Sequence, residues 1–167
     1  MDNRLKYTIF ETSQGWAGMM SSALGLVRTT LPSSSFQQAF DDLGEAGKEA
    51  ASSPALFADF RERYQAYLDG EIVVFNDPLD MSQGTEFQRK VWAATRLVPY
   101  GETRSYAWVA SKIDNPAAVR AVGNALGKNP LPVVIPCHRI IGNNGGLCGF
   151  GGGLAMKRRL LELERRS

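Results

Sequence analysis

Cysteine and histidine are scarce in this chain of 167 residues, which has two cysteines and one histidine. So few thiols exclude a disulfide-stapled scaffold. The two cysteines, Cys137 and Cys148, stand eleven positions apart and do not make a zinc set with one histidine. We therefore expect no metal and no cofactor.

Long hydrophobic runs are lacking as well. No run of about 20 apolar residues occurs, which excludes a membrane-spanning helix. The first ten residues lack the charged-then-apolar pattern of a secretion signal. We expect a cytoplasmic protein without a membrane partner, associated with the nucleoid if the source is prokaryotic.

Charge is distributed unevenly along the chain. Residues 1–82 carry six Lys and Arg against twelve Asp and Glu, whereas residues 83–167 carry thirteen against five. The sequence therefore predicts an acidic support domain over 1–82, including a polar linker at 76–82, and a basic working domain over 83–167. The basic half is either a nucleic-acid-binding domain, whose Lys and Arg displace phosphate counterions, or a domain with a solvated basic face and no partner.

The first half has the pattern of an α/β module. Residues 7–10, 25–30 and 72–75 are rich in strand-forming residues and are bounded by turn signals. Residues 33–43 and 54–68 have the spacing of helices, the second ending at an Asp-Gly pair.

The second half is predicted to be mostly helical. A helix follows Thr85 as its N-cap, and a helix-turn-helix follows it. Its first helix is Tyr106–Lys112, and its second runs from Pro116 to Leu126 and ends at Gly127. The second helix has a face of very small side chains with one long cation, Arg120, which fits either contact with a DNA groove or close packing inside the domain.

The reactive centre of the sequence is Pro136-Cys137-His138-Arg139. The apolar residues 133–135 predict a buried strand that leads into it. A thiolate needs a base or a positive field, and both types of residue are adjacent, so we expect a Cys137 pKa below the usual value of about 8.5. In an extended strand, however, neighbouring side chains point to opposite faces. A contact between the thiol and the imidazole therefore requires a turn at Cys137 or a bridging water.

A glycine-rich run at 149–153 contains Phe150 and precedes a predicted helix over 154–165. Such a run lets the backbone approach a ligand closely, or it is a flexible linker. The aromatic residue and the helix favour an ordered pocket wall.

At these residues the sequence resembles the O6-alkylguanine-DNA alkyltransferase family. The resemblance is dense over residues 83–165 and loose before them. The matching stretches are Gly84-Thr85-Glu86-Phe87-Gln88, Val91-Trp92, Val98-Pro99-Tyr100-Gly101, Thr103-Arg104-Ser105-Tyr106, Val119-Arg120-Ala121-Val122-Gly123, Asn129-Pro130, Ile135-Pro136-Cys137-His138-Arg139-Ile140-Ile141 and Gly149-Phe150-Gly151-Gly152-Gly153. Lys157, Leu160-Leu161 and Glu164 also fit.

The resemblance implies a ribonuclease-H-like N-terminal module, with a small antiparallel sheet and helices, and a C-terminal helix-turn-helix module. It also implies an activity, the irreversible transfer of an alkyl group from O6-alkylguanine, and from O4-alkylthymine, in double-stranded DNA to Cys137, once per molecule. In that mechanism His138 deprotonates the thiol through water, Glu164 orients His138, and Tyr106 assists the leaving base. We expect a monomer, with cooperative binding to DNA as a further possibility.

Other residues are assigned to DNA and to the alkyl pocket by the same resemblance. The residues expected at DNA are Arg120, which enters the base stack, and Ala121, Gly123, Ser105, Thr103, Lys128 and Arg139. The residues expected around the flipped base and its alkyl group are Asn129, Pro132, Val134, Phe150 and Gly151.

Three positions depart from the family pattern: Phe150 replaces a usual Tyr, Cys148 a small residue, and Trp108 is unusual. Three other functions compete with repair. An alkyltransferase-like damage sensor would lack the reactive cysteine, and a DNA-binding regulator would need a further domain. A Cys–His hydrolase would need its two groups in direct contact and an oxyanion hole.

Overall fold

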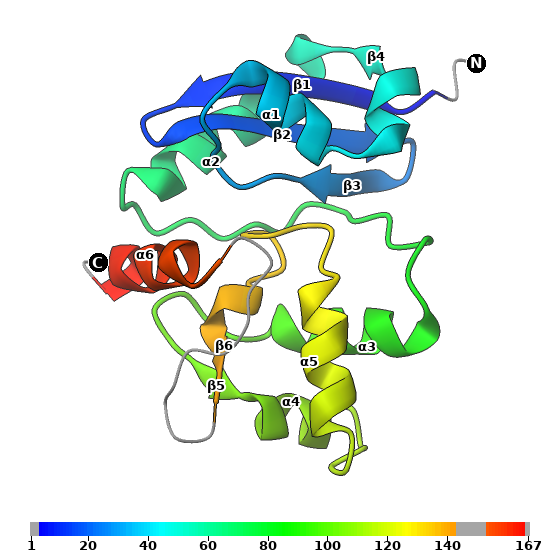
Figure 1. Cartoon of the computed structure of the whole chain (residues 1–167), viewed down its shortest axis with the longest axis vertical. Helices are drawn as coiled ribbons and strands as arrows, with labels where there is room; N and C mark the ends of the chain where they lie inside the picture. Colours follow the sequence, from blue (N-terminus) through cyan, green and yellow to red (C-terminus); the bar gives the residue numbers. More distant parts are fainter. Residues whose placement is uncertain (1–3, 143–152, 166–167) are drawn as a thin grey trace. The chain divides into compact units, whose positions relative to one another are not determined.

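The computed structural model describes residues 4–142 and 153–165, and its chain divides into two compact units, Met1–Met81 and Ser82–Ser167 (Figure 1). No helix among the described residues is long and apolar enough to cross a membrane.

The N-terminal unit is built on a four-stranded sheet in the order β3-β2-β1-β4. Its strands are β1 (Lys6–Thr12), β2 (Gly15–Ser22), β3 (Gly25–Thr29) and β4 (Ala51–Ser52). The first three are antiparallel neighbours, as predicted, but β4 pairs with β1 in parallel, so the sheet is mixed. The β1–β2 hairpin turns at Gly15, whose φ of 126° suits glycine.

Helices cover this sheet and bury an aromatic core. They are α1 (Phe36–Asp42), α2 (Ala58–Leu68) and the short 3-10 turns η1 (Glu45–Glu49) and η2 (Pro54–Phe57). Ser35 caps α1 as its side chain accepts a hydrogen bond from the Gln38 N–H. The buried Tyr64 stacks on Phe60 and donates its hydroxyl to the Thr30 carbonyl.

The strand predicted over Ile72–Phe75 does not form. This segment is irregular, with Ile72 and Val74 exposed and Phe75 buried against Phe60 and Tyr67. Its β-branched residues find no strand partner, and one aromatic side chain anchors the segment instead.

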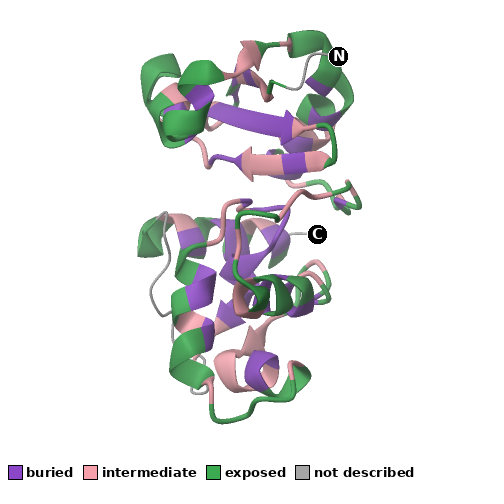
Figure 2. Ribbon diagram, turned by 90° about the vertical axis from the view of Figure 1, so that its right-hand side faces the viewer, coloured by how far each residue is buried: buried purple, intermediate pink, exposed green. Residues whose placement is uncertain are grey.

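The C-terminal unit is mostly helical, as predicted. Its elements are α3 (Glu86–Thr95), β5 (Arg104–Ser105), α4 (Tyr106–Lys112), α5 (Val119–Gly127), η3 (Cys137–Arg139), β6 (Ile140–Ile141) and α6 (Leu154–Arg165). Thr85 and Gln88 form a capping box at the start of α3. Helices α3, α4 and α5 pack together, and their contact sides are buried (Figure 2). The Trp92 indole N–H of α3 donates to the Ala125 carbonyl of α5.

The connection between α4 and α5 starts after Lys112, as predicted, but extends three residues further than predicted at its end. Helix α4 ends in a Schellman motif, in which Asp114 N–H donates to Ser111 and Asn115 N–H donates to Ala110. Asp114 takes the left-handed position of that motif, with φ 57°. Helix α5 begins at Val119 and not at Pro116, because residues 116–118 continue the turn.

Candidate active site

The residues that lead into Cys137 form a compact turn, so the strand predicted over 133–135 is wrong. Ile135 N–H donates to the Leu131 carbonyl at 2.8 Å, which reverses the chain. Val133 has φ 76°, a conformation that β-branched residues rarely adopt. Proline at 132 and 136 explains the failure, since neither residue has the N–H that a central strand donates.

Pro136 then directs the chain into η3. Its angles, φ −79° and ψ 64°, and the 2.7 Å hydrogen bond from Cys137 N–H to the Ile135 carbonyl define an inverse γ-turn. In the 3-10 turn that follows, successive side chains are about 120° apart and not on opposite faces. The turn that the sequence required at Cys137 is therefore present.

Asn129 holds this turn and contacts the sulfur. Its Nδ2 donates to the Ile135 carbonyl at 2.8 Å and to Cys137 Sγ at 3.0 Å. Its Oδ1 accepts from Leu131 N–H at 2.8 Å. The side-chain amide thus fixes the backbone before the cysteine and also points a donor at the thiol, where a thiolate would be stabilised.

His138, Arg139 and Glu164 form a buried charged cluster behind the cysteine. Glu164 reaches it from α6, and its Oε2 lies 2.6 Å from His138 Nε2. Arg139 donates to both oxygens of the carboxylate, at 2.8 and 3.0 Å, and to the Val98 carbonyl. Gly101 N–H donates to the same carboxylate. All four lone-pair directions of Glu164 are therefore engaged.

These contacts set the protonation states of the pair. Burial alone would raise the pKa of Glu164, but hydrogen bonds from His138 and Arg139 outweigh it and hold this pKa well below its usual range. Burial lowers the pKa of His138, against the opposing effect of Glu164. The carboxylate is thus ionised and the imidazole neutral. Its proton lies on Nε2 facing Glu164, which leaves the lone pair on the buried Nδ1.

The Cys137 thiol is less acidic than the sequence suggested. Burial raises its pKa, and this outweighs the hydrogen bond from Asn129 and the charge of Lys157. The predicted lowering is therefore wrong for the protein without DNA. The residue is 7% exposed, so the neutral thiol is the favoured form.

Lys157 belongs to the site, although its match to the family pattern predicted no role for it. It is 1% exposed and donates from Nζ to the Ile140 carbonyl at 2.7 Å. Its ammonium lies 5.9 Å from the centre of the Tyr106 ring. The signal was its spacing, because 157, 160, 161 and 164 share one buried face of α6.

The parallel pair β5–β6 links α4 to this cluster. Ile140 and Ile141 follow η3 directly and pair with Arg104 and Ser105, which precede α4. Ser105 then caps α4 by accepting a hydrogen bond from Trp108 N–H. Tyr106, the first residue of α4, is half-buried.

The residues assigned to DNA separate into two groups. Arg120, Ala121 and Lys128 are exposed on α5 or at its end, and Thr103, Ser105 and Gly123 are half-buried. Arg139 is 8% exposed and paired with Glu164, so its position does not support the predicted DNA contact.

The residues assigned to the alkyl pocket are only partly described. Asn129 and Pro132 are half-buried, and Val134 is buried in the turn before Cys137. Phe150 and Gly151, like Cys148, lie outside the described residues.

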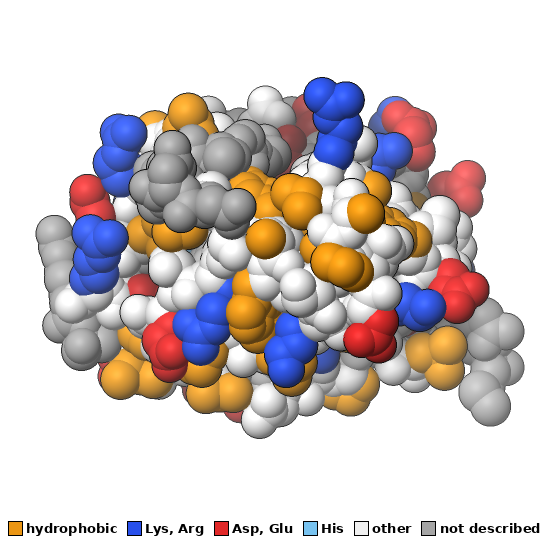
Figure 3. Space-filling view, turned by 90° about the horizontal axis from the view of Figure 1, so that it is seen from below, with side chains coloured by type: hydrophobic (Ala, Val, Ile, Leu, Met, Phe, Trp, Pro, Cys, Tyr) orange, Lys and Arg blue, Asp and Glu red, His pale blue; other side chains and the backbone are white. Residues whose placement is uncertain are grey.

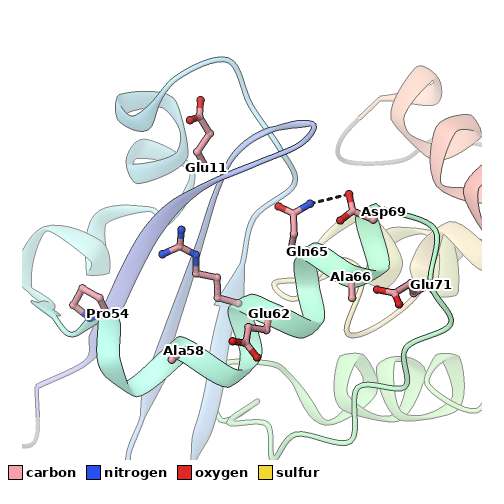
Figure 4. A pocket seen from close by; sticks show the side chains of 9 residues that line it. Glu11, Pro54, Ala58, Glu62, Gln65, Ala66, Asp69 and Glu71 are labelled. Atoms are coloured by element: carbon pink, nitrogen blue, oxygen red, sulfur yellow. Dashed lines mark hydrogen bonds between the residues drawn. The ribbon is translucent and has the colours of Figure 1, made fainter.

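The described residues offer no other centre of comparable chemistry. No group of three His, Cys, Asp or Glu side chains among them could hold a metal. A shallow pocket of about 550 Å³ in the N-terminal unit is lined mainly by α2. There Gln65 donates to Asp69 beside the further carboxylates Glu11, Glu62 and Glu71 (Figure 4). No Cys or His is among its lining residues.

Comparison with known proteins places these features in one family. The family model described as "6-O-methylguanine DNA methyltransferase, DNA binding domain" matches residues 86–166. A methylated-DNA–protein-cysteine methyltransferase of Mycolicibacterium paratuberculosis is 53% identical over 114 residues, which is 68% of each chain. The inducible enzyme of that name from Bacillus subtilis is 50% identical over 101 residues, 60% of this chain and 56% of that one.

Solved structures agree over nearly the whole chain. The O6-methylguanine methyltransferase of Mycobacterium tuberculosis superposes with a TM-score of 0.82 at 36% identity, covering 97% of this chain and 93% of that one. The M. tuberculosis OGT in complex with DNA gives a TM-score of 0.81 at 37% identity, covering 96% and 93%. This chain belongs to the methylated-DNA–protein-cysteine methyltransferase family.

Proposed function

We infer that this protein repairs DNA by direct reversal, transferring an alkyl group from O6-alkylguanine in DNA to Cys137. The observation that carries this inference is the Cys137 sulfur, which accepts a hydrogen bond from Asn129 and stands next in sequence to the His138–Glu164 pair. This arrangement supplies a nucleophile, a base and a group that orients the base.

The base acts through Nδ1, the ring nitrogen that does not face Glu164. His138 Nδ1 takes the thiol proton through one bridging water. Nε2 keeps its own proton and donates it in a hydrogen bond to Glu164. The imidazolium that forms is stabilised by the Glu164 carboxylate, which Arg139 holds in place. The thiolate is stabilised by Asn129 and by the charge of Lys157.

The transfer is a single displacement. Cys137 Sγ attacks the alkyl carbon, a C–S bond forms, and the bond from that carbon to guanine O6 breaks. The electron pair of the broken bond stays on the guanine, which takes up a proton with assistance from the Tyr106 hydroxyl. The thioether product is stable, so each molecule acts once.

DNA is held by the basic C-terminal domain, 83–167, while residues 1–82 support it. Helices α4 and α5 act as a helix-turn-helix whose second helix lies against a groove. Its exposed small residue Ala121 permits the close approach. Arg120 fills the base stack when the alkylated nucleotide is flipped toward Cys137. Asn129, Pro132, Val134, Phe150 and Gly151 surround the flipped base.

Several finer expectations complete the proposal. We expect O4-alkylthymine to be a second substrate. We expect the N-terminal domain to be ribonuclease-H-like, and the protein to be a monomer that binds DNA with or without cooperativity. We expect the protein in the cytoplasm and, in a prokaryote, at the nucleoid. A non-catalytic sensor and a DNA-binding regulator remain the competing functions.

The test is intact-mass measurement after incubation with duplex DNA containing one O6-methylguanine. We expect the mass of one methyl group to be gained, and peptide mapping to place it on Cys137. Cys137→Ser should gain nothing and still bind DNA, whereas the matched variant Cys148→Ser should react like the parent. Label on Cys148, or transfer in Cys137→Ser, would contradict the assignment.

A further inference from the structure

Trp108 on α4 lies between two cations. The Arg104 guanidinium carbon and the Lys112 ammonium each lie 5.6 Å from the centre of a Trp108 ring. Lys112 follows Trp108 by one helical turn, and Arg104 stands in β5 directly before the helix. We call these three residues the cation–indole cluster.

Contacts around Arg104 hold this arrangement in place. Arg104 donates to the Thr103 carbonyl at 2.8 Å and to Glu102 at 2.9 Å. The backbone of Trp108 is held at the start of α4 because its N–H donates to the side chain of Ser105, the N-cap. Lys112 is exposed and Trp108 and Arg104 are half-buried, so the cluster is open to solvent.

The cluster holds two positive charges close together, and packing of the indole does not require either of them. Two cations repel each other, and Glu102 offsets only one of them. The indole face attracts both and keeps them close without neutralising them. Since each cation is 5.6 Å from a ring centre of the same indole, the two lie on the order of 11 Å apart at most. One strand of duplex DNA carries one phosphate per about 3.4 Å of helix axis, so both cations can reach phosphates of the same strand.

We propose that the cation–indole cluster binds the phosphate backbone of one DNA strand. The proposal rests on the proposed function, because it takes α4 as the first helix of a helix-turn-helix, the one that crosses the backbone. Phosphate oxygens accept hydrogen bonds from both cations, and the Arg104 guanidinium can donate to a phosphate as well as to Glu102. The basic side chains of this domain lie beside hydrophobic ones on the face seen from below (Figure 3).

The indole has its own role in this site. It limits the conformations of Arg104 and Lys112 before DNA arrives, so less side-chain entropy is lost on binding. This gives a function to Trp108, which has no part in the proposed catalytic steps and is not buried in the helical core of the domain. The cluster reads no base, so it strengthens binding to damaged and undamaged duplexes alike.

The experiment measures affinity for an undamaged duplex by fluorescence anisotropy over a range of salt concentrations. Arg104→Gln and Lys112→Gln should each lower the slope of log affinity against log salt by about 0.9, which is about eightfold weaker binding near 0.1 M salt. Trp108→Leu should weaken binding severalfold, and Trp108→Phe, which keeps an aromatic face, should restore part of the loss. The matched control is Lys48→Gln, an exposed lysine paired with Glu45 in the acidic unit, whose slope should equal that of the parent.

Circular dichroism and thermal unfolding of each variant establish that the fold is intact. Parent-like slopes and affinities in Arg104→Gln and Lys112→Gln would overturn the proposal, and so would parent-like binding by Trp108→Leu. The proposed function fails separately, if the parent binds DNA but leaves Cys137 unmodified by O6-methylguanine DNA.

Discussion

We expect the buried His138–Glu164 pair to govern the rate of transfer, because His138 takes the proton of Cys137 while the Glu164 carboxylate stays ionised and holds the imidazole. We expect the single-turnover rate of the parent to rise with pH, because burial raises the pKa of Cys137 and more thiolate forms as pH increases. His138→Ala removes the base and should slow transfer at neutral pH by about 100-fold or more. The deficit should shrink at alkaline pH, where the thiol ionises without help.

Glu164→Gln should slow transfer in the same way but less, since the Glu164 carboxylate only orients the imidazole and stabilises its charge. The matched control is Glu162→Gln, an exposed carboxylate on the same helix, which should react like the parent. Rates are measured by quenched reactions with duplex DNA over a pH series. A His138→Ala profile that superimposes on that of the parent would remove the base from the mechanism.

At the scale of elements, the α4–α5 turn carries a residue in a costly conformation. Asp114 occupies the left-handed position of the Schellman motif, which glycine takes at the least cost. Asp114→Gly should therefore raise the free energy of unfolding by about 0.5–1 kcal/mol. Asp114→Asn is the matched control, since it removes the charge but keeps a side chain at this position. Urea unfolding measures both, and an equal gain in the two variants would assign the effect to charge instead of backbone.

Elements with a strong local signal were predictable from the sequence. Helix α6 has the predicted bounds, 154–165, and α4 has the predicted cap, Ser105. Both depend on periodicity and capping, which act within a few residues. The turn at Val133 was not predictable, because three consecutive apolar residues look like a strand until the hydrogen bond between Leu131 and Ile135 is known.

The grouping of Asn129, Cys137, His138 and Glu164 was predictable, but the electrostatics of the group were less so. The Cys137 and His138 pair is adjacent in sequence, and Glu164 came from the family resemblance. The direction of the Cys137 pKa was wrong because the sequence lists neighbouring charges but does not give burial. Lys157 fitted the family pattern, but no role was predicted for it, for the related reason that a lysine is ordinarily assigned to the surface.

At the scale of the whole molecule, the buried cluster makes stability depend on pH. The pKa of His138 is lowered in the folded state, so below about pH 6.5 the unfolded chain binds the extra proton and the free energy of unfolding falls. The pKa of Glu164 is also lowered, and its contribution is present above about pH 4.3 and lost as pH falls further. Stability of the C-terminal unit should therefore decline in two stages on acidification.

Urea unfolding at several pH values measures this dependence. Trp16→Phe leaves tryptophan only at 92 and 108, so fluorescence then reports on the C-terminal unit. Adding His138→Gln should remove the first stage and leave the second. A first stage that persists in that variant would show that another group takes up the proton.

The enclosure of Cys137 also affects how long an unreacted molecule survives. Oxidation by peroxide follows thiolate character and exposure, and Cys137 is a buried residue, 7% exposed, whose thiol has a raised pKa. It therefore rests as a protonated, shielded thiol that reacts slowly with small oxidants. For a protein that is consumed by one alkyl group, this resistance preserves the stock of competent molecules between encounters with damage.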